Sequence, residues 1–127
     1  MVKTISLTGA DGSPLDVTLR STAATKIFYR QTFGRDLYKE LGWLNSHGAD
    51  EEADGRAADL VGQLAYILMK GGKGESMTCS KEDYFAWLDT LDEFALMNHG
   101  DEILRTYANQ TAPESIEKNR AAQLSGN

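Results

Sequence analysis

Few side chains in this sequence could support catalysis or bind a metal ion, and those few lie far apart. His47 and His99 are the only histidines, and Cys79 is the only cysteine. A zinc site usually takes three or four such ligands in a tetrahedron, so these residues form no recognisable metal motif. We interpret both histidines as surface or helix-capping residues and Cys79 as a small residue near a helix start. Cys79 and His99 could form a nucleophile–base pair only if the fold brought them together, because no local sequence pattern supports such a pair.

Carboxylates are numerous, and two of them with separated pKa values in one cleft could perform general acid–base catalysis. Asp89 and Glu93 would share one face of an unbroken helix, but such pairs usually form a solvated surface. The Gly72-Lys73-Gly74 segment resembles part of a phosphate loop, yet Gly74 stands where a Ser or Thr would hold magnesium. We therefore expect no cofactor and predict that the protein is not an enzyme.

The aromatic side chains favour a different chemistry, the binding of another protein. A core built from so few hydrophobic residues does not need all of the large aromatic side chains present, among them Trp43, Phe85 and Trp87. Trp and Tyr are enriched at binding hot spots, although they also fill small cores, and the core role is the favoured interpretation. The candidate partner contacts are these three residues together with two apolar residues near the C-terminus, Ile116 and Leu124.

Composition and charge restrict the class of partner. The chain has 127 residues, which suits one domain, and a formal net charge of −6. An acidic balance argues against nucleic acid, because phosphate contacts need clustered Lys and Arg. No apolar run reaches the roughly 20 residues that span a bilayer, and the N-terminus has no apolar signal-peptide core. Since a single cysteine fits a reducing compartment, we expect a cytoplasmic protein that binds neither nucleic acid nor membrane.

The first twenty residues predict a β-hairpin with one buried face. Apolar and polar residues alternate in 2–8 and again in 15–20, and the run between them has a turn composition. The apolar members of the alternation are Ile5, Leu7, Leu15, Val17 and Leu19. Because a lone hairpin is marginal in water, we expect it to dock on the helices that follow.

Capping residues and helical periodicity predict a corner of two helices after the hairpin. Ser21 or Thr22 can cap the first helix. Its short apolar face would consist of Ala23, Ile27 and Phe28, with Tyr29 and Phe33 close by. Gly34 ends that helix in a left-handed conformation, and Asp36 starts the second helix. The acidic segment 45–55 is predicted to be a solvated loop.

The second half of the chain is also predicted to be helical. A broad apolar face over 56–70 indicates a central helix that packs on two sides and is ended by Gly71 and Gly72. Ser80 opens a sequence similar to a capping box before the next helix. Residues 92–108 form either one imperfect helix or two short ones.

Together these elements predict an α+β, mainly helical fold, with an N-terminal hairpin (2–20) packed on a bundle of about four helices (22–108). We expect one globular domain over 1–108. A flexible C-terminal tail is expected over 109–127, because apolar residues become sparse there and Pro113 interrupts any helix.

One run of residues also resembles a known family. Tyr29-Arg30, Phe33-Gly34 and Asp36-Leu37 give the pattern Y-R-x-x-F-G-x-D-L, which is similar to the tail assembly chaperones of long-tailed bacteriophages and prophages. The order of segments is similar as well: a hairpin, this corner, the apolar helix LVGQLAYILMK, a polar loop, a capped helix beginning K-E-D-Y-F, and the acidic stretch LDTLDEF. The resemblance covers residues 2–108, and the tail shows no pattern that aligns.

The resemblance implies a non-enzymatic role in building the phage tail. Such chaperones bind the long tape-measure protein, keep it soluble until tube subunits polymerise around it, and are absent from the finished virion. Many are also made in a longer form by programmed ribosomal frameshifting, and that form is thought to recruit the tail-tube protein. The implied partners are therefore a tape-measure protein and, through a longer form, a tail-tube protein, in the cytoplasm of a bacterial host.

Other interpretations stay open beside this one. The protein could be a generic acidic adaptor or regulator of a basic partner, unrelated to tails. Gene order would separate the two, since a tail chaperone gene should lie between a tail-tube gene and a very long tape-measure gene. Self-association through the client-binding surface is also open. A shared pocket of perturbed titratable groups would instead favour an enzyme.

Overall fold

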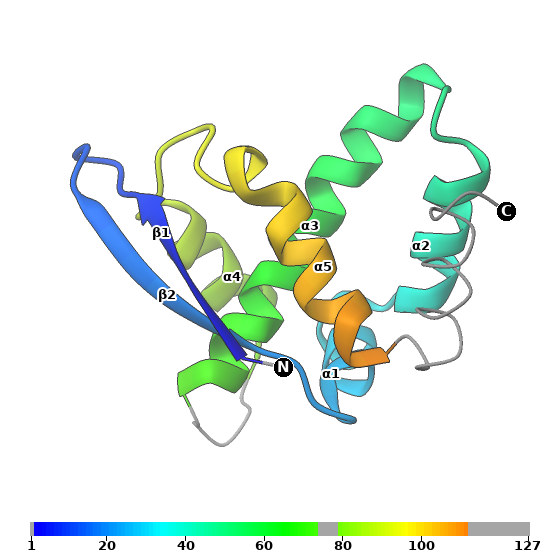
Figure 1. The fold of residues 1–127 in the computed structure, drawn as a ribbon, viewed down its shortest axis with the longest axis horizontal. Helices are drawn as coiled ribbons and strands as arrows, with labels where there is room; N and C mark the ends of the chain where they lie inside the picture. Colours follow the sequence, from blue (N-terminus) through cyan, green and yellow to red (C-terminus); the bar gives the residue numbers. More distant parts are fainter. Residues whose placement is uncertain (1, 74–78, 112–127) are drawn as a thin grey trace, which may run out of the picture.

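The chain folds into a two-stranded antiparallel hairpin followed by a set of helices (Figure 1). The computed structural model describes residues 2–73 and 79–111, with side chains up to residue 108. The elements are β1 (Val2–Thr8), β2 (Pro14–Arg20), α1 (Thr25–Phe33), α2 (Leu37–Ser46), α3 (Glu51–Lys73), α4 (Lys81–Leu88), the 3₁₀-helix η1 (Met97–His99) and α5 (Gly100–Thr111). The predicted α+β, mainly helical fold with an N-terminal hairpin is therefore confirmed.

The hairpin has the predicted alternation of buried and exposed side chains. Ile5 is paired with Val17, and Leu7 with Leu15. The buried members on one face are Ile5, Leu7, Val17 and Leu19, whereas Leu15 stays 38% exposed near the turn. Burying one face of a two-stranded sheet needs a partner surface, and that surface is provided mainly by α3, which packs along β2.

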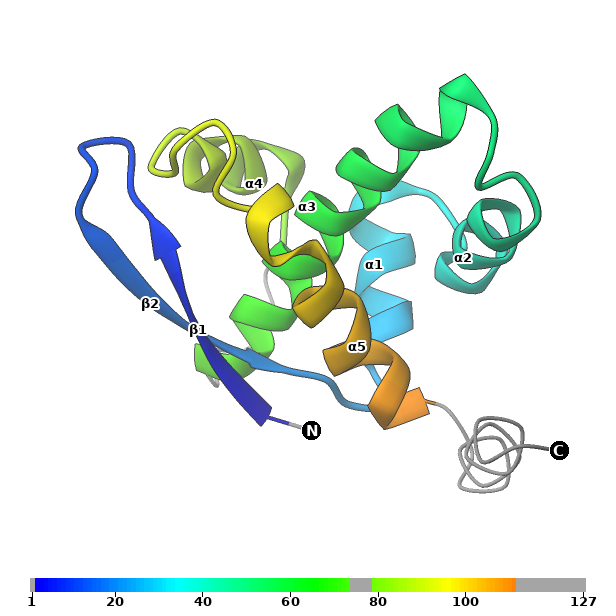
Figure 2. The same cartoon turned by 45° about the horizontal axis from the view of Figure 1, so that its top comes forward.

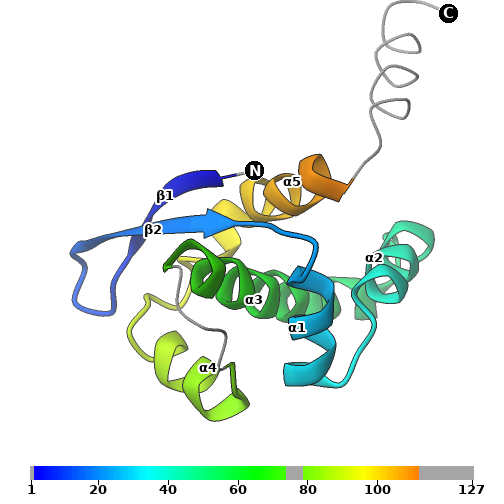
Figure 3. The same cartoon turned by 90° about the horizontal axis from the view of Figure 1, so that it is seen from below.

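Helix α3 is the centre of the molecule. Figure 3 shows the hairpin and α5 on one side of α3 and α1 and α4 on the other, while α2 lies near the N-terminal half of α3 (Figure 2). This arrangement confirms the prediction of a central helix packed on two sides. It also explains why the middle of α3 is buried all around, from Leu60 to Met69.

The prediction of a solvated loop over 45–55 is wrong for its second half, because α3 begins at Glu51. Three acidic residues, Glu51, Glu52 and Asp54, occupy the first turn of the helix. Carboxylates at this end are favoured by the positive pole of the helix dipole and by the unpaired N–H groups. The acidic cluster therefore starts a helix rather than interrupting one.

The prediction that Gly71 and Gly72 end this helix is also wrong, since α3 continues to Lys73. Both glycines lie where the helix crosses close to the backbone of β2. A Cβ on Gly71 would stand 2.8 Å from the carbonyl oxygen of Arg20, and one on Gly72 would overlap the carbonyl oxygen of Thr18. The two residues lack side chains because the strand leaves no room for them.

The corner between α1 and α2 follows the sequence prediction. Gly34 has a left-handed φ of 72°, and its N–H donates to the carbonyl oxygen of Arg30. Asp36 is the N-cap residue of α2, and its carboxylate accepts from the backbone N–H of Lys39 at 3.0 Å. The hydrogen bond from the Lys39 N–H lowers the pKa of the Asp36 carboxyl group.

The start and the inner face of α1 differ from the prediction. The helix begins at Thr25 after Ala24, and no side chain caps it. Thr22 instead accepts a hydrogen bond from the N–H of Ala24 in the preceding turn, at 3.2 Å. The buried residues of α1 are Thr25, Tyr29, Thr32 and Phe33, whereas Ala23 and Ile27 are exposed. The helix is rotated so that its Tyr and Phe rings, which have larger apolar surfaces, face the core.

The last third of the chain contains the predicted cap and a break. Ser80 accepts from the N–H of Asp83 at 3.0 Å and so caps α4. Residues 93–96 then form turns before η1 and α5, so 92–108 is not one helix. Helix α5 extends to Thr111 and so enters the segment predicted as a tail from residue 109 onward. Ile116 and Leu124 lie outside the described residues.

Candidate functional site

Two grooves border α4, and each contains one of the aromatic residues singled out from the sequence. The first, here called the Phe85 groove, has a volume of about 340 Å³. It is lined by Phe33, Arg35, Asp59, Gln63, Lys81, Tyr84, Phe85 and Leu88. The second, here called the edge groove, has a volume of about 440 Å³. It is lined by Leu15, Asp16, Val17, Thr18, Met69, Gly72, Lys73, Trp87 and Thr90.

Aromatic rings in mutual contact line the Phe85 groove. Phe33 and Tyr84 meet edge to face with ring centroids 5.1 Å apart, and Tyr84 is buried. The Tyr84 ring lies against α3 at Gly62, where a Cβ would stand 2.6 Å from the tyrosine hydroxyl. Phe85 lies next to Tyr84, at 5.5 Å between centroids, and remains 59% exposed. A rigid aromatic wall beside an exposed Phe is suited to receive an apolar side chain.

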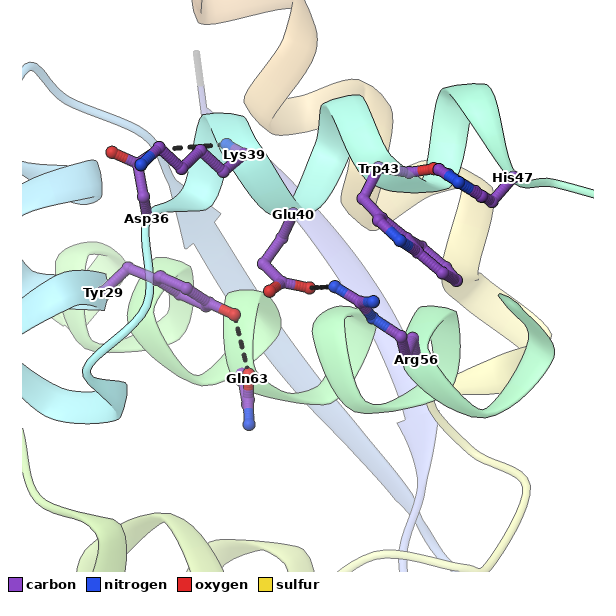
Figure 4. Close-up of polar contacts among 8 residues, drawn as sticks. All are labelled: Tyr29, Asp36, Lys39, Glu40, Trp43, His47, Arg56 and Gln63. Carbon is purple, nitrogen blue, oxygen red and sulfur yellow. Dashed lines mark hydrogen bonds and ion pairs between the residues drawn. The ribbon is translucent and has the colours of Figure 1, made fainter. Parts of the chain in front are cut away.

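One buried amide adds a polar group to this groove. Gln63 is 9% exposed, and its Oε1 accepts a hydrogen bond from the Tyr29 hydroxyl at 2.7 Å. Figure 4 shows the other end of the amide pointing away from Tyr29. Among the described residues this second end has no hydrogen-bond partner, and Gln63 lines the groove. An amide held at one end can thus bind a backbone or side-chain polar group of a ligand at the other.

Charged groups are also part of the Phe85 groove. Arg35 and Lys81 bring two positive charges, and Asp59 brings one negative charge. Apolar pockets with a few placed polar and charged groups are typical of binding sites, because the polar groups fix the orientation of the ligand. The arrangement favours recognition of a segment with one or two apolar side chains and a polar backbone nearby.

Buried tyrosines beside this groove predict an alkaline unfolding transition. Burial raises the pKa of Tyr29 and that of Tyr84 from 10.0 to about 12. Their contribution to stability is complete below pH 10 and is lost as the pH rises toward 12, because only the unfolded chain ionises easily there. The urea concentration at the unfolding midpoint should therefore decrease as the pH is raised from 10 to 12. This midpoint should decrease less steeply with pH for Tyr84→Phe than for the parent protein. Equal pH dependence in the two proteins would contradict the role given to Tyr84.

Trp43 lies elsewhere, between α2 and α3. The guanidinium of Arg56 stands 3.6 Å from the indole ring centroid, and His47 stacks on the indole at 4.5 Å with an interplanar angle of 9°. Arg56 also pairs with Glu40 at 3.0 Å (Figure 4). The structure therefore does not bring Trp43 together with Phe85. A partner-contact role for Trp43 stays a prediction, and its contacts within the chain tie two helices together.

Replacing Trp43 by Ala should lower the free energy of unfolding by about 2 kcal/mol, less than for a fully buried Trp because the ring is half-buried. His47→Ala removes only one stacked ring and should cost less than about 1 kcal/mol. Urea unfolding followed by fluorescence or circular dichroism measures both values. If Trp43→Ala keeps its stability but loses partner binding, the indole is a contact residue and not a packing residue.

The remaining candidates for chemistry have structural partners. His47 is the C-cap residue of α2 and is exposed, as expected. The His99 ring lies 3.0 Å from the carboxylate of Glu102. Burial raises the pKa of the Cys79 thiol, which disfavours the reactive thiolate. In residues 2–73 and 79–111, no group of three or more His, Cys, Asp or Glu side chains is placed to hold a metal ion.

Asp83, on α4, contacts two residues of α3. Its carboxylate accepts from the Tyr66 hydroxyl at 2.7 Å and pairs with Lys70 at 2.8 Å. The hydrogen bond from Lys70, followed by that from Tyr66, lowers the pKa of Asp83. These contacts join α4 to the C-terminal half of α3, and so fix the helix that separates the two grooves.

No protein-family model, curated protein or solved structure matches the chain. Within the described part of the chain, no helix is both long enough and apolar enough to cross a membrane.

The core role that the sequence favoured for Phe85 is wrong, because the side chain is 59% exposed and lines a groove. Gln63 was the available signal for this groove, because it is a polar residue inside the most apolar run of the chain, LVGQLAYIL. Arg35 and Asp59 gave no local signal, since the corner between α1 and α2 meets α3 only in the fold. Trp87 is half-buried against the core and lines the edge groove, so Phe85 and Trp87 belong to two different surfaces.

Proposed function

We propose that this protein is a protein-binding chaperone whose client contact is the Phe85 groove. The observation that carries the proposal is a 59% exposed Phe beside an aromatic wall and an amide, Gln63, whose oxygen is held by Tyr29. Exposing so large an apolar ring to water is unfavourable for a protein acting alone. It becomes favourable when a client side chain covers the ring, and aromatic residues next to a pocket are typical binding hot spots.

The client that fits the resemblance is a phage tape-measure protein. Such a client is long and helical, and it aggregates through its apolar faces. One amphipathic helix could insert apolar residues beside Phe85 in a helix-in-groove complex. The net charge of −6 would keep the complex dispersed. The proposal includes a non-enzymatic role in the bacterial cytoplasm and recruitment of the tail-tube protein by a longer, frameshifted form.

Co-expression tests this function. The protein is produced with the product of the longest reading frame downstream of its gene, and the soluble fraction is analysed by size-exclusion chromatography. We expect the long product to be insoluble alone and to co-elute in soluble form with this protein. A long product that stays insoluble, or the lack of a long helical reading frame nearby, would leave the protein as an acidic adaptor with another client.

A further inference from the structure

Within residues 2–73 and 79–111, no backbone hydrogen bond reaches the outer edge of β2 at Asp16 or at the N–H of Thr18, and the direction of these groups can be assigned from the backbone contacts. The carbonyl oxygen of Thr8 accepts from the N–H of Asp92, so it points away from β2. In an antiparallel pair the N–H and C=O groups of a residue point to the same side, and successive residues alternate. Thr8 is paired with Pro14, and Thr4 with Thr18. The backbone groups of Asp16 and Thr18 therefore point away from β1, toward the outer edge of β2.

The C-terminal turn of α3 covers only one end of this edge. Gly71 and Gly72 pack against the outward carbonyls of Arg20 and Thr18. The stretch from Pro14 to the N–H of Thr18 lies beyond that contact. This stretch lines the edge groove, which is the largest of the grooves described above. An unpaired strand edge along a groove is a ready template for another strand.

Side chains in the edge groove define what such a strand would carry. Met69 and Trp87 line it on the side toward the helices, together with Leu15. The side chain of Asp16 is exposed, on the opposite face of the sheet from the core. An added strand would place alternate side chains on these two faces. Apolar residues would face Met69 and Trp87, and a Lys or Arg on the solvent face would complement Asp16.

We propose that the outer edge of β2, from Pro14 to Thr18, binds an extended segment of a partner protein as a third strand of the sheet. The segment alternates apolar residues with polar or basic ones. The main-chain hydrogen bonds to Asp16 and Thr18 supply affinity, and the edge groove selects the apolar side chains. This site is distinct from the Phe85 groove and does not depend on the identity of the client proposed above.

A random heptapeptide library, selected against the purified full-length protein, provides the probe. Amide hydrogen exchange is then measured by NMR with and without the best synthetic peptide. We expect an alternating consensus and at least tenfold slower exchange for the amides of Asp16 and Thr18, with no change at Ser6 on the opposite edge. Absence of binders, or binders that protect other residues only, would overturn the proposal.

Two edge prolines give a matched pair of variants. Asp16→Pro removes an outward N–H without breaking a hydrogen bond between β1 and β2, and Ser6→Pro does the same on the outer edge of β1. We expect Asp16→Pro to weaken peptide binding at least tenfold and Ser6→Pro to leave it unchanged. Equal affinities for the two variants would overturn the proposal.

If Asp16→Pro does not fold, methylated peptides replace it as the test. Two peptides are made, one methylated on its odd-numbered and one on its even-numbered backbone nitrogens. One of the two should lose binding to the wild-type protein, and the other should keep it. Equal binding of the two peptides would also overturn the proposal, because a third strand uses only every second N–H of the peptide.

Discussion

Replacing Gly72 by Ala is expected to lower the free energy of unfolding by about 3 kcal/mol, at the upper end for overpacking. The new Cβ would overlap the carbonyl oxygen of Thr18 and stand 2.7 Å from its carbonyl carbon. These are backbone atoms of β2, so no side-chain rotation can relieve the clash. The helix and the strand must separate, and the buried contacts between them are lost. Urea unfolding of the two proteins measures the difference.

Gly42→Ala provides the matched control, because Gly42 lies inside α2 and a Cβ there meets nothing within 4 Å. Alanine favours the helix over glycine by roughly 0.5–1 kcal/mol, so this variant should be more stable than the parent. Gly71→Ala should fall between the two, since its Cβ would approach the Arg20 carbonyl to 2.8 Å. If Gly72→Ala were as stable as Gly42→Ala, α3 would not cross β2 as closely as described.

Replacing Phe85 by Ala is expected to weaken client binding by about 2 kcal/mol, which corresponds to roughly a thirtyfold loss of affinity. The side chain is 59% exposed, so its removal should change the urea midpoint little. The loss of affinity would come from the apolar surface that the client no longer covers. Isothermal titration with the soluble client, or with its binding segment as a peptide, measures the effect.

Phe94→Ala is the control for this experiment. Phe94 is 60% exposed, which matches Phe85, but it does not line either groove beside α4. We expect the Phe94 variant to bind the client like the parent. Equal losses for the two variants would indicate a general effect of surface apolarity rather than a contact at Phe85.

The parts of the fold that the sequence predicted correctly depend on neighbours in the chain. The hairpin follows from alternating residues, the corner from Gly34 and Asp36, and the start of α4 from Ser80. In each case the deciding interaction spans a few residues or a regular period. Such signals are strong because the backbone geometry of a turn or a cap is local.

The wrong predictions involve contacts between distant segments. Gly71 and Gly72 have the composition of a helix end, and only the approach of β2 shows why a continuing helix needs them. The rotation of α1 toward Tyr29 and Phe33 depends on where α3 and α4 lie. Local propensity is a weak prior that tertiary packing overrides.

The candidate site shows the same division between local and distant information. Residue type singled out Phe85 as a candidate contact but favoured a core role for it, and only the structure shows that it is among the most exposed large apolar residues of the described chain. Its neighbours Asp59 and Gln63 come from α3, and Arg35 comes from the corner between α1 and α2. No sequence period links residues from three helices, so the groove could be recognised only from the fold.

Photo-crosslinking from position 85 tests the central claim most directly. A benzoylphenylalanine replaces Phe85 in one sample and Phe94 in another, and each protein is co-expressed with the client and irradiated. We predict that position 85 crosslinks in high yield to one amphipathic segment of the client, identified by mass spectrometry, and that position 94 does not. Crosslinks from position 94 alone, or none from position 85 in a soluble complex, would show that the client binds elsewhere and would contradict the assignment of the Phe85 groove.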